Sequence, residues 1–108
     1  MKLVDLVHYF TNGGSYKEFC RSQSLELKSE VIEVYMEGQF DVNNEIAFFE
    51  TEKTFGKVEC VFNGTKYINL FDFFYFLDTI EESKSSENQA ITDAEIASIL
   101  LSYARDDA

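Results

Sequence analysis

Hydrophobic residues near the N-terminus recur at helical spacing and predict two short helices. Residues 2–10 carry apolar side chains at i, i+3, i+4 and i+7, namely Leu3, Leu6, Val7 and Phe10. Asn12-Gly13-Gly14 then supplies residues that tolerate the left-handed conformation that ends a helix. Ser15 followed by Glu18 forms a capping box, so a second helix begins there and buries Tyr16, Phe19 and Cys20.

The most apolar stretch of the chain is 66–82, which contains four phenylalanines within six residues. Its spacing predicts a helix capped by Asn69, around which the rest of the chain packs. The expected buried face consists of Leu70, Phe73, Phe74, Leu77 and Ile80. Asp72 and Asp78 lie beside this face and would form its polar edge.

Alternation of apolar and polar residues predicts three strands, over 45–53, 57–62 and 65–68. Asn63-Gly64 stands between the last two. This dipeptide favours a two-residue type I′ turn, because both central residues of that turn need positive φ. The second half of 45–53 is expected to reach solvent.

Residues 25–38 fit two structures. As a strand, Ile32, Val34 and Met36 share one face, and the β-branched residues support this reading. As a helix, which we favour at this point, Gly38 ends the element. Four glutamates then form an acidic ridge on one face, namely Glu26, Glu30, Glu33 and Glu37.

The C-terminal part reads as a polar linker and one more helix. Residues 83–89 contain no apolar side chain, and Thr92 with Glu95 forms a second capping box. The helix that follows is expected to bury Ile96, Ile99, Leu100 and Tyr103. We therefore predict a single α+β domain over 1–108, with a small antiparallel sheet of three to four strands packed against N-terminal and C-terminal helices.

The charge distribution narrows the choice of partner. The net charge is -11, and residues 25–60 hold nine acidic and three basic side chains. Such a surface repels nucleic acid and anionic lipid, and it steers a basic partner toward itself. The alternative is that the charge only keeps the protein soluble. The chain has no apolar run of membrane-spanning length and no secretory signal, so we expect a cytoplasmic protein with two reduced cysteines, Cys20 and Cys60.

The residues offer little catalytic chemistry, and we expect no enzymatic activity, no cofactor and no metal. Cys20 and Cys60 lack zinc-ligand spacing, and the single histidine, His8, has no partner at ligand spacing. A Gly-rich phosphate loop and a nucleophile elbow are both missing. A small enzyme that uses Asp72 and Asp78 beside the phenylalanines is the weakest alternative.

Five segments together resemble the immunity proteins encoded beside bacterial polymorphic toxins, including those of contact-dependent growth inhibition systems. The resemblance covers most of the chain, through the N-terminal helices and the runs 29–36, 44–50, 66–71 and 94–103. It implies a protein that binds one cognate toxin domain, often a nuclease, and blocks its active site or substrate surface. It implies no particular binding residues.

Local charge and aromatic content suggest where such a toxin would bind. Aromatic anchors ringed by charged residues are the usual anatomy of a binding hot spot. The candidate patch comprises Glu30, Glu33, Tyr35, Met36, Glu37, Phe40 and Asp41. The alternative function is a non-catalytic acidic regulator or adaptor that binds a host enzyme.

Overall fold

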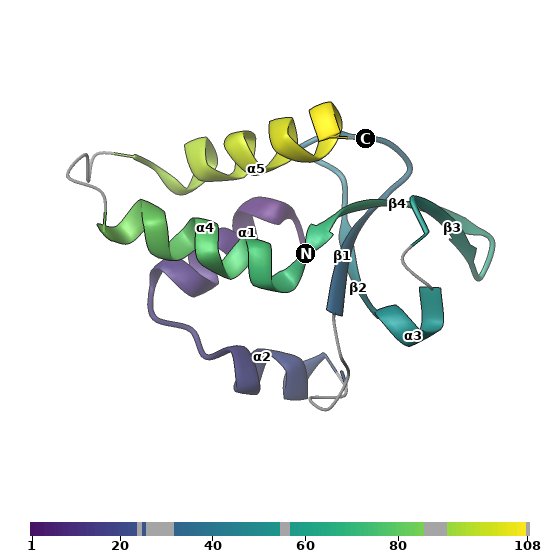
Figure 1. Cartoon of the computed structure of the whole chain (residues 1–108), viewed down its shortest axis with the longest axis horizontal. Coiled ribbons are helices and arrows are strands. Elements are labelled where there is room, and N and C mark those ends of the chain that lie inside the picture. Colours follow the sequence, from purple (N-terminus) through teal and green to yellow (C-terminus); the bar gives the residue numbers. More distant parts are fainter. Residues whose placement is uncertain (24, 26–31, 55–56, 86–90, 108) are drawn as a thin grey trace.

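The fold consists of four longer helices, one single-turn helix and a four-stranded sheet (Figure 1). The structure is a computed structural model that describes residues 1–23, 25, 32–54, 57–85 and 91–107. In chain order the elements are α1 (Leu3–Thr11), α2 (Tyr16–Ser22), β1 (Ile32–Glu37), β2 (Ile46–Glu50), α3 (Thr51–Thr54), β3 (Glu59–Phe62), β4 (Thr65–Asp72), α4 (Phe73–Ser85) and α5 (Asp93–Asp107). The predicted α+β class and antiparallel sheet are confirmed.

The strands are antiparallel and follow the order β2-β1-β4-β3, which leaves β2 and β3 at the edges. Helices α1, α4 and α5 pack together at one end of the molecule, while β3 and α3 lie at the other (Figure 1). One face of β1 and β4 contributes to the main core with these helices. Because the helices do not extend over β3, that strand is positioned to meet other molecules.

Phe73 stands at the centre of the core. Its side chain is fully buried, and its ring lies within 5.0 to 5.8 Å of five other aromatic rings. These rings come from α1, α2, β2 and α4, and they belong to Phe10, Tyr16, Phe19, Phe48 and Phe76. The phenylalanine-rich segment therefore organises the core, as the sequence predicts.

The helix expected over 25–38 is wrong for residues 32–37, which form β1. Strand β1 pairs with β2 on one side and β4 on the other, so Ile32, Val34 and Met36 enter the core. Pairing on both sides outweighs the helical preference of the glutamates. The acidic ridge does not form as predicted, because a strand places Glu33 and Glu37 on the face that also carries Tyr35.

The helix predicted from Asn69 begins later, at Phe73. Asn69 lies inside β4, and Asp72 caps the helix instead, with its Oδ1 accepting a hydrogen bond from the Tyr75 N–H at 2.8 Å. A bulge in the β1–β4 pairing places the adjacent Leu70 and Phe71 both in the core.

This later start rotates the buried face of α4. Phe76 replaces Phe74 in the core, and Phe74 is 50% exposed. Of the residues expected on the buried face, Phe73 and Ile80 are buried, Phe74 is exposed and Leu77 is half-buried.

Local signals elsewhere are confirmed. Asn63 and Gly64 have φ of 53° and 81°, as a type I′ turn requires. The Ser15 and Thr92 side chains accept hydrogen bonds from the Glu18 and Glu95 N–H groups. Helix α1 buries all four of its predicted apolar residues.

Three other predictions need correction. The strand predicted over 45–53 ends at Glu50, which is buried rather than solvent-exposed, and α3 follows it. In α5, Ile99 and Tyr103 are exposed, while the buried face continues through Ala97, Leu101 and Ala104. The linker predicted over 83–89 is wrong for residues 83–85, which belong to α4, and residues 86–89 lie outside the described part.

The raised pKa of the Tyr16 phenol predicts that the protein loses stability at alkaline pH. Burial, with a smaller contribution from a hydrogen bond to Cys20, raises its pKa from 10.0 to about 12. Because the folded state holds this proton more tightly than the unfolded state does, the Tyr16 phenol contributes to the free energy of unfolding. This contribution is fully present below about pH 10 and is lost as the pH rises toward about 12. We expect Tyr16→Phe to show a smaller fall in unfolding free energy between these pH values, measured by urea denaturation. An equal fall in both proteins would contradict this assignment.

Candidate functional site

Two residues of the predicted binding patch are not at the surface. Tyr35 and Met36 each have no exposed area. The Tyr35 hydroxyl donates a hydrogen bond of 2.6 Å to the Lys57 carbonyl, so the segment after α3 crosses this tyrosine. The prediction that Tyr35 and Met36 act as surface anchors is therefore wrong, because Met36 belongs to the main core and Tyr35 is buried on the other face of β1, against Lys57.

The remaining patch residues divide into three groups. Glu33 is half-buried and accepts a hydrogen bond from Asn69 Nδ2 across the sheet. Glu30 lies outside the described residues. Glu37 is exposed at the end of β1, and the half-buried Phe40 and Asp41 follow it in the β1–β2 loop.

The β1–β2 loop surrounds a hollow of about 550 Å³, which we name the loop hollow. Its lining residues are Glu37, Gly38, Gln39, Asn43, Asn44 and Glu45. Two hydrogen bonds shape this loop: Asn44 Nδ2 donates to the Gln39 carbonyl at 3.0 Å, and the Asn43 N–H donates to Asp41 Oδ1 at 2.9 Å. Two exposed carboxylates, those of Glu37 and Glu45, lie at this hollow, and the Glu45 carboxylate already pairs with the N-terminal ammonium of Met1. The Glu37 carboxylate favours a further cationic group such as a lysine or arginine side chain.

Three exposed apolar side chains lie at the edge of the sheet opposite β2, on both faces of that edge. Val58, Val61 and Phe62 are 63%, 69% and 46% exposed, and we name them the edge patch. Phe62 is supported from the inside by Phe49, whose ring centroid lies 5.3 Å away. Phe49 in turn contacts the buried Tyr35 and the half-buried Tyr67, so a cluster of aromatic rings holds Phe62 in place.

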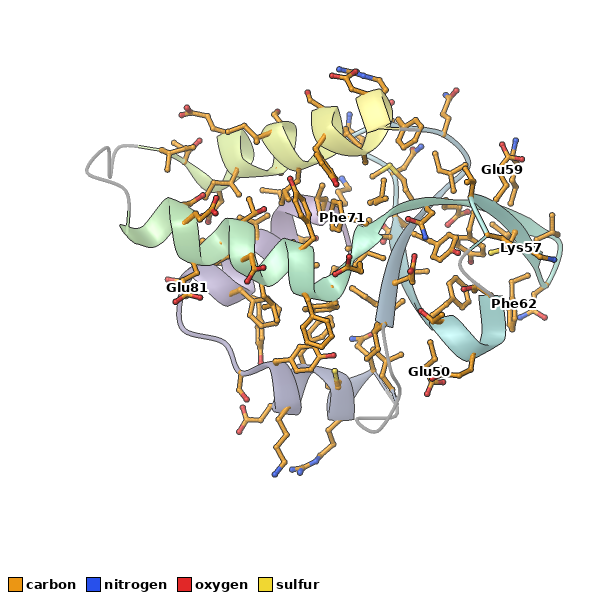
Figure 2. The ribbon with its side chains drawn as sticks, viewed as in Figure 1. Glu50, Lys57, Glu59, Phe62, Phe71 and Glu81 are labelled. Carbon is orange, nitrogen blue, oxygen red and sulfur yellow. The ribbon has the colours of Figure 1, made fainter. Side chains whose placement is uncertain are left out.

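Beside the edge patch runs a second hollow, of about 510 Å³, which we name the edge groove. It is lined by Thr54, Lys57, Glu59, Cys60, Val61, Phe62 and Lys66. Lys66 Nζ lies 3.3 Å from Glu59 Oε1. Figure 2 shows Lys57, Glu59 and Phe62 gathered around the β3–β4 hairpin, far from Glu81 on α4. Burial raises the pKa of the Cys60 thiol, although nearby Lys57 acts in the opposite direction, so Cys60 is poorly suited to act as a thiolate nucleophile.

The two hollows flank the same segment of β4. The Gly38 N–H donates a hydrogen bond of 2.9 Å to the Lys66 carbonyl, and Lys66 pairs with Val61 on its other side. The loop hollow therefore lies on the β1 side of β4 and the edge groove on its β3 side, each about one strand spacing, roughly 5 Å, from β4. One partner of ordinary size can cover both.

The other candidate chemistry has structural partners. His8 Nδ1 lies 2.7 Å from Asp93 Oδ2, which links α1 to α5. Asp72 caps α4, and Asp78 is exposed on that helix. Both cysteines are free thiols, but only Cys20 is buried, whereas Cys60 is half-buried. Within the described ranges, no three histidine, cysteine or acidic residues are grouped to hold a metal ion, and no helix is long and apolar enough to cross a membrane.

The chain matches no protein-family model, no curated protein and no solved structure. The resemblance to immunity proteins stays a prediction. The sequence also gives no direct sign of the edge patch, because the alternation of 57–62 predicts a strand without showing that it lies at an edge. The nearest signal is Val61, an apolar residue next to a hairpin turn.

Proposed function

We propose that this protein is an immunity protein that binds a cognate bacterial toxin domain in the cytoplasm and blocks its active site or substrate-binding surface. The observation that carries the proposal is the combination of an exposed apolar patch with an acidic hollow next to it, on a chain of net charge -11. A toxin that holds a nucleic-acid backbone needs a basic surface, and the same surface is attracted to this protein.

The two parts of the surface contribute differently to binding. The edge patch supplies apolar area that is desolvated on contact, which provides affinity. The carboxylates of the loop hollow accelerate association and select a basic partner, since exposed charges act mainly on encounter. Buried Tyr35 and Met36 hold this surface in shape and do not contact the toxin.

The first test is co-purification with the C-terminal domain encoded by the neighbouring upstream gene, together with growth of cells that express that domain. We expect a tight complex and restored growth only when this protein is present. A complex without restored growth would favour the adaptor function instead. Neither complex nor rescue would reject the immunity function for that pair.

Removal of charge around the loop hollow tests the steering role. We expect the triple variant Glu37→Gln, Asp41→Asn and Glu45→Gln to associate with the toxin about three to ten times more slowly at low salt. The difference should shrink as salt screens the remaining charges. The measurement is stopped-flow association at several salt concentrations.

A matched control removes three charges elsewhere. Glu18→Gln, Asp78→Asn and Asp106→Asn change the net charge equally, but these residues lie on α2, α4 and α5. We expect this control to retain most of the association rate. Equal slowing in both triple variants would show that only the net charge matters and that the loop hollow faces no partner.

A further inference from the structure

Among the residues that the structure describes, strand β3 has a neighbouring strand on one side only. It pairs with β4 through Cys60–Tyr67 and Phe62–Thr65, and the Asn69 N–H also donates to the Val58 carbonyl at 2.8 Å. In an antiparallel ladder, hydrogen-bonded residues alternate with residues whose N–H and C=O point away. The backbone groups of Glu59 and Val61 therefore point outward from the sheet.

The edge groove lies along this outward side. Four consecutive residues of β3, from Glu59 to Phe62, line it, although successive side chains of a strand point to opposite faces. A hollow that contacts all four of these residues follows β3 along its length, and Lys66 of β4 also lines it. Its volume of about 510 Å³ has room for a short extended segment.

The edge of β3 also lacks the features that usually prevent strand addition. Edges are commonly blocked by proline, by a bulge or by charges at their centre. The chain contains no proline, the β3–β4 register is continuous, and Val61 is highly exposed. Only Glu59 places a charge on this strand.

Charge decides which segment fits. A second copy of this chain would bring another net charge of -11 to the same edge, so self-pairing is opposed. A basic segment is attracted by the net charge of the whole chain, although Lys57 and Lys66 also line the edge groove. Its basic side chain opposite β3 must share Glu59 with Lys66, which lies 3.3 Å from that carboxylate. Because side chains alternate along a strand, the register asks for apolar residues opposite Cys60 and Phe62 and for a basic residue opposite Glu59.

We infer that β3 binds its partner by strand addition: an extended, alternately apolar and basic segment enters the edge groove and becomes the fifth strand of the sheet. This inference rests on the proposed function for the identity of the partner as a toxin. The binding mode is testable with a peptide alone.

The probe is the capped peptide Lys-Val-Lys-Val-Thr-Val-Lys. On saturation we expect amide hydrogen exchange at Glu59 and Val61 to slow at least about tenfold, because these N–H groups gain partners. The amides of Cys60 and Phe62 already bond to β4 and should change little. Protection at the loop hollow instead, or no protection anywhere, would overturn the inference.

Substitution at Val61 separates backbone pairing from side-chain contact. Val61→Pro removes the outward N–H while sparing the β4 ladder, and we expect peptide binding to weaken about tenfold. Val61→Thr keeps the N–H and the branched shape, and it should bind within about threefold of the original protein. Equal affinities for Val61→Pro and Val61→Thr would contradict strand addition.

Peptides that each carry one backbone N-methyl group provide a second test of strand addition. This test does not depend on whether the Val61→Pro variant folds. Methylation should abolish binding at alternate positions only, namely those that face β3. Equal loss at every position, or no loss, would reject the proposal.

Binding of the toxin distinguishes the strand-addition inference from the proposed immunity function. A complex that forms equally with Val61→Pro would overturn strand addition and leave the immunity function intact. Peptide protection at Glu59 and Val61 without any toxin complex would support the binding mode and reject the function.

Discussion

We expect Phe73→Ala to lower the free energy of unfolding by about 4 kcal/mol, one of the two largest effects expected for this protein. The Phe73 ring is fully buried and contacts aromatic rings from α1, α2, β2 and α4. Its removal leaves a cavity that these rigid rings cannot close. Urea denaturation monitored by circular dichroism gives the measurement.

Phe74→Ala is the matched control. Phe74 is the next residue on α4, has the same chemistry and is half exposed. We expect it to cost about 1 kcal/mol, mainly through its ring contact with Tyr16 at 6.0 Å. Similar losses at both positions would mean that the helix is rotated as the sequence alone predicts, with Phe73 and Phe74 sharing the buried face.

The second large effect is expected at Tyr35. Tyr35→Ala should cost about 4 kcal/mol, because it removes a fully buried ring beneath the Lys57 segment. Tyr35→Phe retains the ring and loses only the hydrogen bond to the Lys57 carbonyl, so about 1 kcal/mol should be lost.

The same variants decide how Tyr35 relates to binding. A surface anchor would show weaker toxin binding with unchanged stability in Tyr35→Phe. We expect the reverse, with lower stability and nearly unchanged affinity. Strong loss of affinity at full stability would restore Tyr35 to the binding surface and contradict its burial.

Signals confined to a few neighbouring residues predicted their structures well. The Asn63-Gly64 turn, the caps at Ser15 and Thr92 and the apolar spacing of α1 each depend on residues within one or two turns. Their physics is local: a positive φ, an unsatisfied N–H or one face of one helix. The fold class followed because these elements leave few ways to bury their apolar faces.

The errors occurred where distant residues decide. Glutamates favour a helix over 25–38, but β1 pairs with two other strands. No residue near β1 in the sequence indicates that pairing. Asn69 and Asp72 are both good caps, and the pairing of β4 with β1 selects Asp72. The candidate patch failed at Tyr35 for the same reason, since the segment that covers it is more than twenty residues away.

The position of β3 at an edge is likewise a property of the assembled sheet. The alternation around Val61 is the same for a central strand and an edge strand, so exposure could not be read from it. The exposure of acidic residues around the β1–β2 loop was better predicted, because Glu37 and Asp41 are near each other in the chain.

The strand order also sets the sequence of events during folding. Strands β1 and β2 are neighbours in the chain, as are β3 and β4, so each pair can form as a local hairpin on a microsecond timescale. The central β1–β4 pairing must instead close the entire segment from Gly38 to Gly64, which makes it the entropically slow step. Until that closure occurs, Phe71 lacks its partner Val34 across the sheet, and the newly made chain is most vulnerable to aggregation.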